Sequence, residues 1–131
     1  MIFTIVINGA PYSGANSTSF QALNFTRALL AAGHTIGRLF FYGDGVYNLN
    51  AQAITPQGEF DLPAAWADLI NEHKLDSVVC IAAAARRGIL DTSEAKRHQR
   101  PAPNLLAGSE LSGLGQLIEA TTTSDRVITF N

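Results

Sequence analysis

The stretch that decides the fold is Asp76-Ser77-Val78-Val79-Cys80-Ile81-Ala82, followed at once by Ala83-Ala84-Ala85-Arg86-Arg87-Gly88. A continuous apolar run of this length is typical of a strand that is buried on both faces of a parallel sheet. Cys80 lies near the carboxyl end of the run, and open α/β sheets bind their ligands at the carboxyl ends of their strands. Cys80, with Arg86 and Arg87 after it, is therefore the first candidate for a functional site.

Strands and helices alternate on both sides of this run. Short apolar, β-branched runs predict strands, and helical spacing with cap residues predicts helices. The predicted strands are 2–8, 35–42, 76–82 and 126–130, and the predicted helices are 17–32, 61–73, 91–97 and 112–124. The pattern predicts one three-layer, flavodoxin-like α/β domain over residues 1–131, with a mostly parallel sheet flanked by helices.

This arrangement also predicts what surrounds Cys80. The carboxyl ends of parallel strands meet at one edge of the sheet, so the loops 9–16, 43–58 and 83–90 are expected to lie around the cysteine. The helices are expected to point apolar side chains toward the sheet: Trp66, Leu69 and Ile70 in one helix, and Leu114, Leu117 and Ile118 in the last.

Composition narrows the class of protein. Hydrophobic residues make up 47% of the chain and charged residues 15%, which indicates a generous core or an apolar surface that meets a partner. The net charge of −2 gives no polybasic surface for nucleic acid, so direct binding to nucleic acid is not expected. No apolar stretch reaches the length of a membrane span, and a single cysteine fits a reducing compartment. The expected location is the cytoplasm.

Other interpretations of these residues stay open at this point. Cys80 could be a buried structural side chain, because cysteine often behaves as a small hydrophobe. The loop 9–14 lacks the glycine spacing of phosphate-binding loops, which leaves a nucleotide or flavin binder as a weak alternative. The histidines have no metal-ligand spacing, so no metal is expected, while a pair of Cys80 with His98 remains possible. Asp44, between two glycines, is typical of a turn.

Three separated stretches resemble the DsrE family, and within it most closely the TusD branch. They are FFYGDGVYN (residues 40–48), VVCIAAAARRGI (78–89) and LSGLGQL (111–117), and the resemblance covers nearly the whole chain. Cys80 matches the cysteine that carries sulfur in that family. The segment 11–25 departs from the family pattern.

The resemblance implies a sulfurtransferase that accepts sulfur on Cys80 as a persulfide. Sulfur would come from a TusA-like donor and pass to a TusE-like carrier, for 2-thiouridine formation at the tRNA wobble position. Arg86 and Arg87 would stabilise the thiolate or contact a partner, and no cofactor is implied. The implied assembly is a heterohexamer with TusB-like and TusC-like sister subunits, two copies of each. The alternatives are a DsrE subunit of a dissimilatory sulfur-oxidation pathway and a non-catalytic scaffold subunit.

Overall fold

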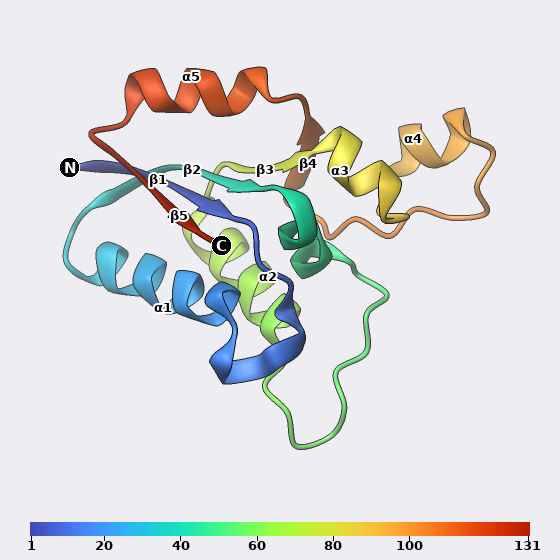
Figure 1. The fold of residues 1–131 in the computed structure, drawn as a ribbon, viewed down its shortest axis with the longest axis horizontal. Coiled ribbons are helices and arrows are strands. Elements are labelled where there is room, and N and C mark those ends of the chain that lie inside the picture. The colour runs from blue at the N-terminus through green and yellow to red at the C-terminus, as the bar shows by residue number, and fades with distance from the viewer.

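Five parallel strands form one sheet in the order β4-β3-β2-β1-β5 (Figure 1). The computed structural model describes the backbone of residues 1–131 and the side chains of residues 1–12 and 16–131. The strands are β1 (Ile2–Ile7), β2 (Thr35–Phe41), β3 (Ser77–Cys80), β4 (Ser109–Ser112) and β5 (Arg126–Phe130). The predicted α/β class, with a parallel sheet flanked by helices, is confirmed.

Helices cover both faces of the sheet. The first pair, α1 (Thr18–Ala31) and α2 (Leu62–His73), packs against one face, and α5 (Gly115–Thr123) lies on the other (Figure 1). Two short helices, α3 (Ile81–Arg86) and α4 (Thr92–Arg97), extend beyond the ends of β3 and β4. Two 3-10 helices, η1 (Pro11–Asn16) and η2 (Gly43–Leu49), follow β1 and β2.

Side-chain caps fix where three of the predicted helices begin. The oxygens of Ser17, Asp61 and Asp91 each accept a hydrogen bond from the backbone N–H three residues later, at 3.0, 3.1 and 2.8 Å. Such a cap satisfies one of the amide groups that a helix start leaves unpaired. Gly33, with φ of +86°, follows the end of α1 in a backbone conformation that favours glycine.

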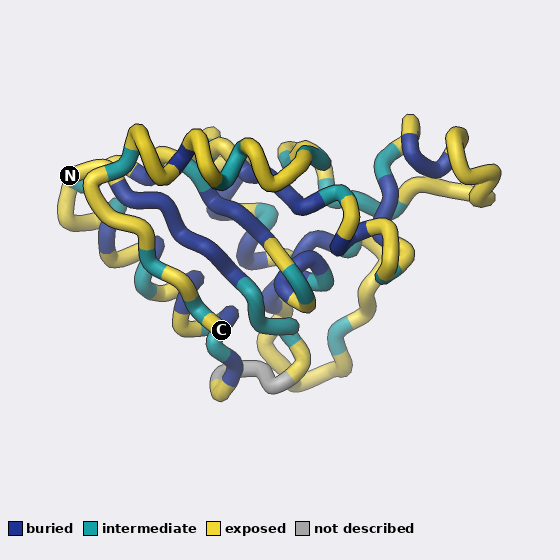
Figure 2. Tube along the Cα trace, turned by 45° about the horizontal axis from the view of Figure 1, so that its top comes forward, coloured by how far each residue is buried: buried dark blue, intermediate teal, exposed yellow. Residues whose placement is uncertain are grey.

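The core lies between the sheet and the pair of helices α1 and α2. Figure 2 shows buried residues along the central strands and exposed residues along most of α5. Trp66 of α2 is fully buried, and its ring meets Phe41 of β2 edge to face, with centroids 5.3 Å apart. The inward positions predicted for this helix, Trp66, Leu69 and Ile70, are confirmed.

Two predicted boundaries are wrong around Cys80. The strand predicted at 76–82 ends at Cys80, and the segment 81–86, expected in part as a loop, is the helix α3. Four consecutive alanines have the highest intrinsic helix propensity, so the chain turns into a helix as soon as the strand ends. The long loop predicted after β2 also begins with a 3-10 helix, η2.

The C-terminal region contains the largest departure. Strand β4 was not predicted, and the helix predicted at 112–124 begins only at Gly115. Leu114 and Ile118, expected to point inward, are 47% and 66% exposed, while Leu117 is half-buried and Ala120 is buried. The small alanine lets the helix backbone approach the sheet, which turns the larger side chains outward.

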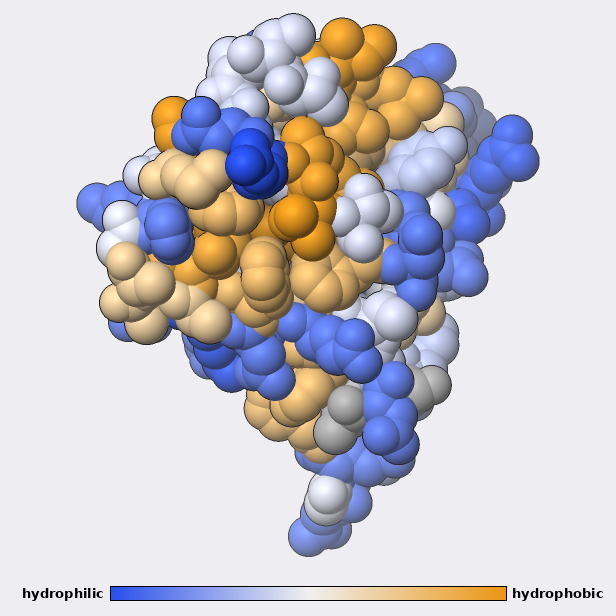
Figure 3. Space-filling model, turned by 60° about the vertical axis from the view of Figure 1, so that its left-hand side comes forward, coloured by the Kyte–Doolittle hydropathy of each residue, from blue (hydrophilic) through white to orange (hydrophobic). Residues whose placement is uncertain are grey.

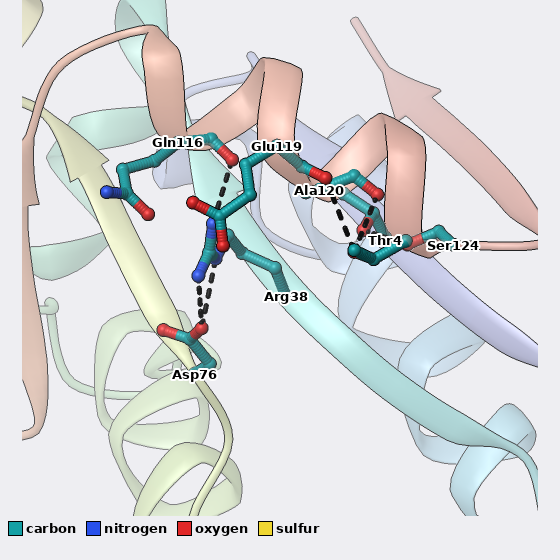
Figure 4. A network of polar contacts seen from close by, with 8 residues as sticks. Thr4, Arg38, Asp76, Gln116, Glu119, Ala120 and Ser124 are labelled. Carbon is teal, nitrogen blue, oxygen red and sulfur yellow. Dashed lines mark hydrogen bonds and ion pairs between the residues drawn. The ribbon is translucent and has the colours of Figure 1, made fainter.

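Polar contacts attach α5 to the sheet (Figure 4). Arg38 of β2 donates from Nε and Nη2 to Asp76 Oδ2, at 3.0 and 2.7 Å, and from Nη1 to the carbonyl of Gln116, at 2.8 Å. At the other end of the helix, the hydroxyls of Thr4 and Ser124 are 2.6 Å apart. These bonds hold a helix whose apolar contact with the sheet is small.

The described part of the chain contains no helix with both the length and the apolar character that crossing a bilayer requires.

Candidate functional site

Cys80 is the last residue of β3, a strand with β2 on one side and β4 on the other. Its thiol is free and only 3% exposed, and the residue lies opposite Ser112 of β4. The small accessible part of the cysteine opens into a pocket of about 520 Å³. Cys80 therefore lines a cavity and exposes little of itself at the molecular surface.

The pocket is built from the carboxyl ends of three neighbouring strands. Its lining comes from the end of β2, from β3 and α3, and from the turn between β4 and α5; the residues are Tyr42, Gly43, Cys80, Ile81, Ala82, Ala83, Arg86, Arg87, Gly113 and Leu114. The loops after β2 and β3 thus meet at Cys80. The loop expected at 9–16 does not contribute any of its described residues to this pocket, and residues 13–15 lie outside the described side chains. The contribution of Gly113 and Leu114 was not predicted.

Both predicted arginines line the pocket, in different settings. Arg87 donates from Nε to Asp44 Oδ1 and from Nη1 to the carbonyl of Ala83, both at 3.0 Å, so its guanidinium is held in place. Arg86 is exposed, and no carboxylate of the described residues pairs with it. Arg86 therefore brings an unpaired positive charge to the pocket, whereas Asp44 offsets part of the charge of Arg87; none of the described residues that line the pocket is acidic.

A tight turn after β2 places Asp44 beside Arg87. Gly43 has φ of +55°, and a side-chain carbon at Gly45 would overlap the carbonyl oxygen of Ile7. Only glycine permits this approach of η2 to the end of β1. Asp44, expected in a turn, lies in the first turn of η2, and its carboxylate forms an ion pair with Arg87 that the sequence did not predict.

A buried network of hydrogen bonds connects η2 to the end of β1 and to the helices α1 and α2. Asn48 is fully buried; its Nδ2 donates to the carbonyls of Gly9 and Gly45, at 3.0 and 2.8 Å. Its Oδ1 accepts from Ser19 Oγ at 2.6 Å, and that hydroxyl accepts from Trp66 Nε1 at 3.3 Å. The sequence analysis did not identify Asn48. Its position between the apolar residues Val46 and Leu49 indicates a buried amide and could have pointed to it.

His98 is not a partner of Cys80. It lines a second pocket, of about 310 Å³, with Ala85, Arg100 and Asn104, and its Nε2 lies 3.6 Å from Glu94 Oε2. The Cys80–His98 pair left open by the sequence does not form. Among the described side chains, the structure brings together no group of three or more potential metal ligands.

The fold and the pocket define a class: a three-layer α/β protein with a single thiol at the carboxyl end of a central strand. The particular assignment comes from the sequence. Residues 1–130 match the DsrE/DsrF-like family, and the chain belongs to that family.

Named relatives cover almost the full length of the chain. A sulfurtransferase TusD homolog of Pseudomonas aeruginosa is 52% identical over 130 residues, which are 99% of this chain and 97% of the relative. Sulfurtransferase TusD of Cronobacter sakazakii is 45% identical over 130 residues, which are 99% of this chain and 100% of the relative. A protein of Allochromatium vinosum, provisionally named sulfurtransferase DsrE, is 44% identical over 99% of this chain and 98% of the relative.

One solved structure shows the same fold. The crystal structure of the ychN protein from E. coli aligns with a TM-score of 0.77, over 99% of both chains. Its sequence identity is 24%, so the likeness concerns the fold alone.

Proposed function

We propose that the chain, a sulfurtransferase by family and relatives, accepts a sulfane sulfur on Cys80 as a persulfide and passes it to a TusE-like carrier. The sulfur would serve 2-thiouridine formation at the tRNA wobble position, in the cytoplasm. The observation that carries this proposal is that the chain's single cysteine and two arginines line the same pocket. The TusD relatives, matched over their full lengths, support a role in sulfur transfer.

The first half of the transfer loads Cys80. The Cys80 thiolate attacks the outer sulfur of a persulfide on a TusA-like donor, the donor's S–S bond breaks, and the donor thiolate leaves and takes up a proton. The product is a Cys80 persulfide. This is the thiol–disulfide exchange reaction applied to a persulfide, and it needs no external oxidant or reductant.

The second half empties the site. A thiolate of the TusE-like carrier attacks the outer sulfur, the new S–S bond forms on the carrier, and the Cys80 thiolate is released. A persulfide carries its outer sulfur about 2 Å beyond the first, since that is the length of an S–S bond. From Cys80 the pocket provides the open space that this second sulfur needs, and it lets an attacking thiol reach the second sulfur rather than the buried first one.

The two arginines give the site its electrostatic character. A thiolate or a persulfide anion in the pocket is stabilised by nearby cationic groups. Arg86 supplies a positive charge with no acidic partner among the described residues, and Arg87 is held at the pocket by Asp44, which offsets part of its charge. Cys80 also precedes α3, whose first amide groups have no partner within the helix.

The proposed assembly is a heterohexamer with two copies each of this chain, a TusB-like subunit and a TusC-like subunit. Figure 3 shows apolar side chains gathered on the side of the molecule that holds the N-terminus. Exposed apolar residues of the elements there include Met1, Ile2 of β1 and Val127 of the edge strand β5, and Ile118 of α5 is also exposed. An apolar edge of this kind is suited to a permanent subunit contact.

A second candidate function is sulfur transfer in a dissimilatory sulfur-oxidation pathway. The relative from Allochromatium vinosum, provisionally named sulfurtransferase DsrE, favours it and matches nearly the whole chain. The chemistry at Cys80 would be the same, and the acceptor protein would differ. Comparing sulfur transfer from the loaded chain to a TusE-like carrier and to a carrier of the oxidation pathway distinguishes the two.

The test of the proposed function is intact mass spectrometry under non-reducing conditions. Wild type and Cys80→Ser are incubated with a cysteine desulfurase, cysteine and a TusA-like donor, in the presence of the sister subunits. We expect the wild type alone to gain the mass of one sulfur atom, and a reductant to remove it. No gain on the wild type, with the donor shown to be loaded, would favour the scaffold role for this subunit.

A further inference from the structure

The positive charge of the chain is concentrated in one segment, which begins at the Cys80 pocket. The segment 86–100 holds five of the nine lysines and arginines and two of the eleven acidic residues, a net charge of +3 in a chain of −2. The five basic residues are Arg86, Arg87, Lys96, Arg97 and Arg100. They lie on α3 and α4 or directly after these helices, beyond the end of the sheet (Figure 1).

Three of these charges have no acidic partner. Glu94 is buried and pairs with Arg97 at 3.3 Å, with His98 at 3.6 Å from the same carboxylate. Within the described residues, no carboxylate pairs with Arg86, Lys96 or Arg100, and all three are exposed. This surface is therefore available to an acidic partner.

The second pocket connects this charge to the sulfur site. Helix α3 separates the two pockets: Ala82, Ala83 and Arg86 face the pocket of Cys80, and Ala85 faces the pocket of His98 and Arg100. Ala82 and Ala85 are both exposed. Small side chains on the outer face of a helix let another backbone approach closely, so an extended segment can cross α3 and reach both pockets.

We infer that the surface formed by α3, Lys96 and Arg100 is the docking site for the sulfur-exchange partner. The partner presents a slender segment in which a thiol and a cluster of acidic residues lie a few positions apart. The thiol enters the Cys80 pocket while the carboxylates lie against Lys96 and Arg100. This inference rests on the proposed persulfide chemistry at Cys80 and adds the chemical class of the partner.

The dimensions of a helix set the spacing within that segment. A helix is about 10 Å across, and an extended chain advances about 3.3 Å per residue. Three or four residues between the thiol and the first carboxylate therefore suffice to cross α3. A segment with adjacent thiol and carboxylates would reach only one of the two pockets.

The geometry favours a protein segment over RNA. The group that reacts must reach a sulfur that is 3% exposed, and a thiol on a flexible segment can do so. The basic surface is also local, since the residues outside 86–100 include nine of the eleven acidic side chains. An RNA backbone extending past this surface would meet that negative charge.

The test uses peptide acceptors and the loaded protein. Wild type in its assembled form is loaded on Cys80 with sodium polysulfide, desalted, and checked by intact mass. It is then mixed with a peptide that has one cysteine, four glycines and three glutamates, or with the same peptide carrying glutamines. We expect transfer to the glutamate peptide to be faster by about tenfold at low ionic strength, and the difference to shrink as salt is added.

Variants decide whether this surface is responsible. Lys96→Glu combined with Arg100→Glu should abolish the preference for the glutamate peptide, while Arg27→Glu on the exposed face of α1 should retain it. Both variants must load with sulfur and give the circular dichroism spectrum of the wild type. If the double glutamate variant does not fold, the double variant Lys96→Gln with Arg100→Gln is used in its place.

The outcomes separate the two proposals. Wild type that does not load on Cys80 would overturn the proposed function and this inference together. Loaded protein that transfers sulfur equally to both peptides, or a double variant that keeps the preference, would overturn this inference alone. A labelled RNA oligonucleotide that binds this surface and displaces the glutamate peptide would assign the surface to RNA instead.

Discussion

Replacing Asn48 with alanine should destabilise the protein by about 3 kcal/mol. The amide makes three hydrogen bonds inside the protein: two from Nδ2 to the carbonyls of Gly9 and Gly45, and one to Oδ1 from Ser19. A net value of about 1 kcal/mol for each bond gives this sum, and the buried carbonyl of Gly45, which loses its side-chain donor, adds to the loss. At about 2.1 cal/mol/K of unfolding entropy per residue, the midpoint of thermal unfolding should fall by about 10 °C.

The measurement is thermal and urea unfolding of the wild type and Asn48→Ala, each followed by two optical probes to check for two-state behaviour. Asn24→Ala, at an exposed position of α1, is the matched control and should change the midpoint little. Because Gly43, the first residue of η2, lines the Cys80 pocket, the folded Asn48→Ala protein should also take up sulfur more slowly. A loss of less than about 1 kcal/mol would show that the network does not hold η2 in place.

Three further changes test the structure around the site. Gly45→Ala should prevent the approach of η2 to β1 and give protein that unfolds at a much lower temperature, whereas Gly113→Ala, which has open space around it, should unfold close to the wild type. Partial burial, the phenol of Tyr47 and the Asp44 carboxylate raise the pKa of Tyr12 above its usual 10.0. Alkaline difference spectra of wild type and Tyr12→Phe should therefore show that Tyr12 ionises at a higher pH than a free tyrosine. The contribution of the neutral Tyr12 side chain to stability should be present below pH 10 and be lost as the pH rises through its pKa in the folded protein. Arg38→Gln should lower stability by about 1 to 3 kcal/mol in urea unfolding, because it removes charge-assisted bonds from a mostly buried guanidinium; an unchanged midpoint would mean that α5 does not depend on this contact.

The elements that the sequence predicts well are those with a strong local pattern. β1 and α2 have continuous apolar runs or helical spacing with a clear cap, and both form close to the predicted residues. The position of Cys80 at the carboxyl end of a buried strand also follows from local pattern, because the run before it is apolar throughout. The apolar pattern of a segment was therefore enough to predict an element when that element is buried against the core along its own length.

The elements that the sequence missed depend on contacts between distant segments. β4 has the sequence SELS, without an apolar run, and it exists because β3 offers a free edge: Ser109 lies opposite Ser77, and their hydroxyls are 2.8 Å apart. The ion pair of Asp44 with Arg87 joins η2 to the end of α3, across a sequence separation of 43 residues. The spacing of apolar residues within a segment does not indicate which distant segment it contacts. For the same reason, the sequence alone could not show that Gly113, which follows β4, lines the pocket of Cys80.

The burial of Cys80 has a consequence for how sulfur can be exchanged. A thiol that is 3% exposed cannot meet a second thiol fixed on the rigid surface of another folded protein, because the walls of the pocket would collide with that surface first. The exchange therefore requires two things together: an outer sulfur that projects from Cys80 into the pocket, and a partner cysteine near the end of a flexible segment. The proposed persulfide supplies the first, and the basic surface beside α3 would select the second. A partner whose only reactive cysteine lies within a helix or strand should take no sulfur from the loaded protein, and transfer to such a partner would show that the pocket opens during exchange.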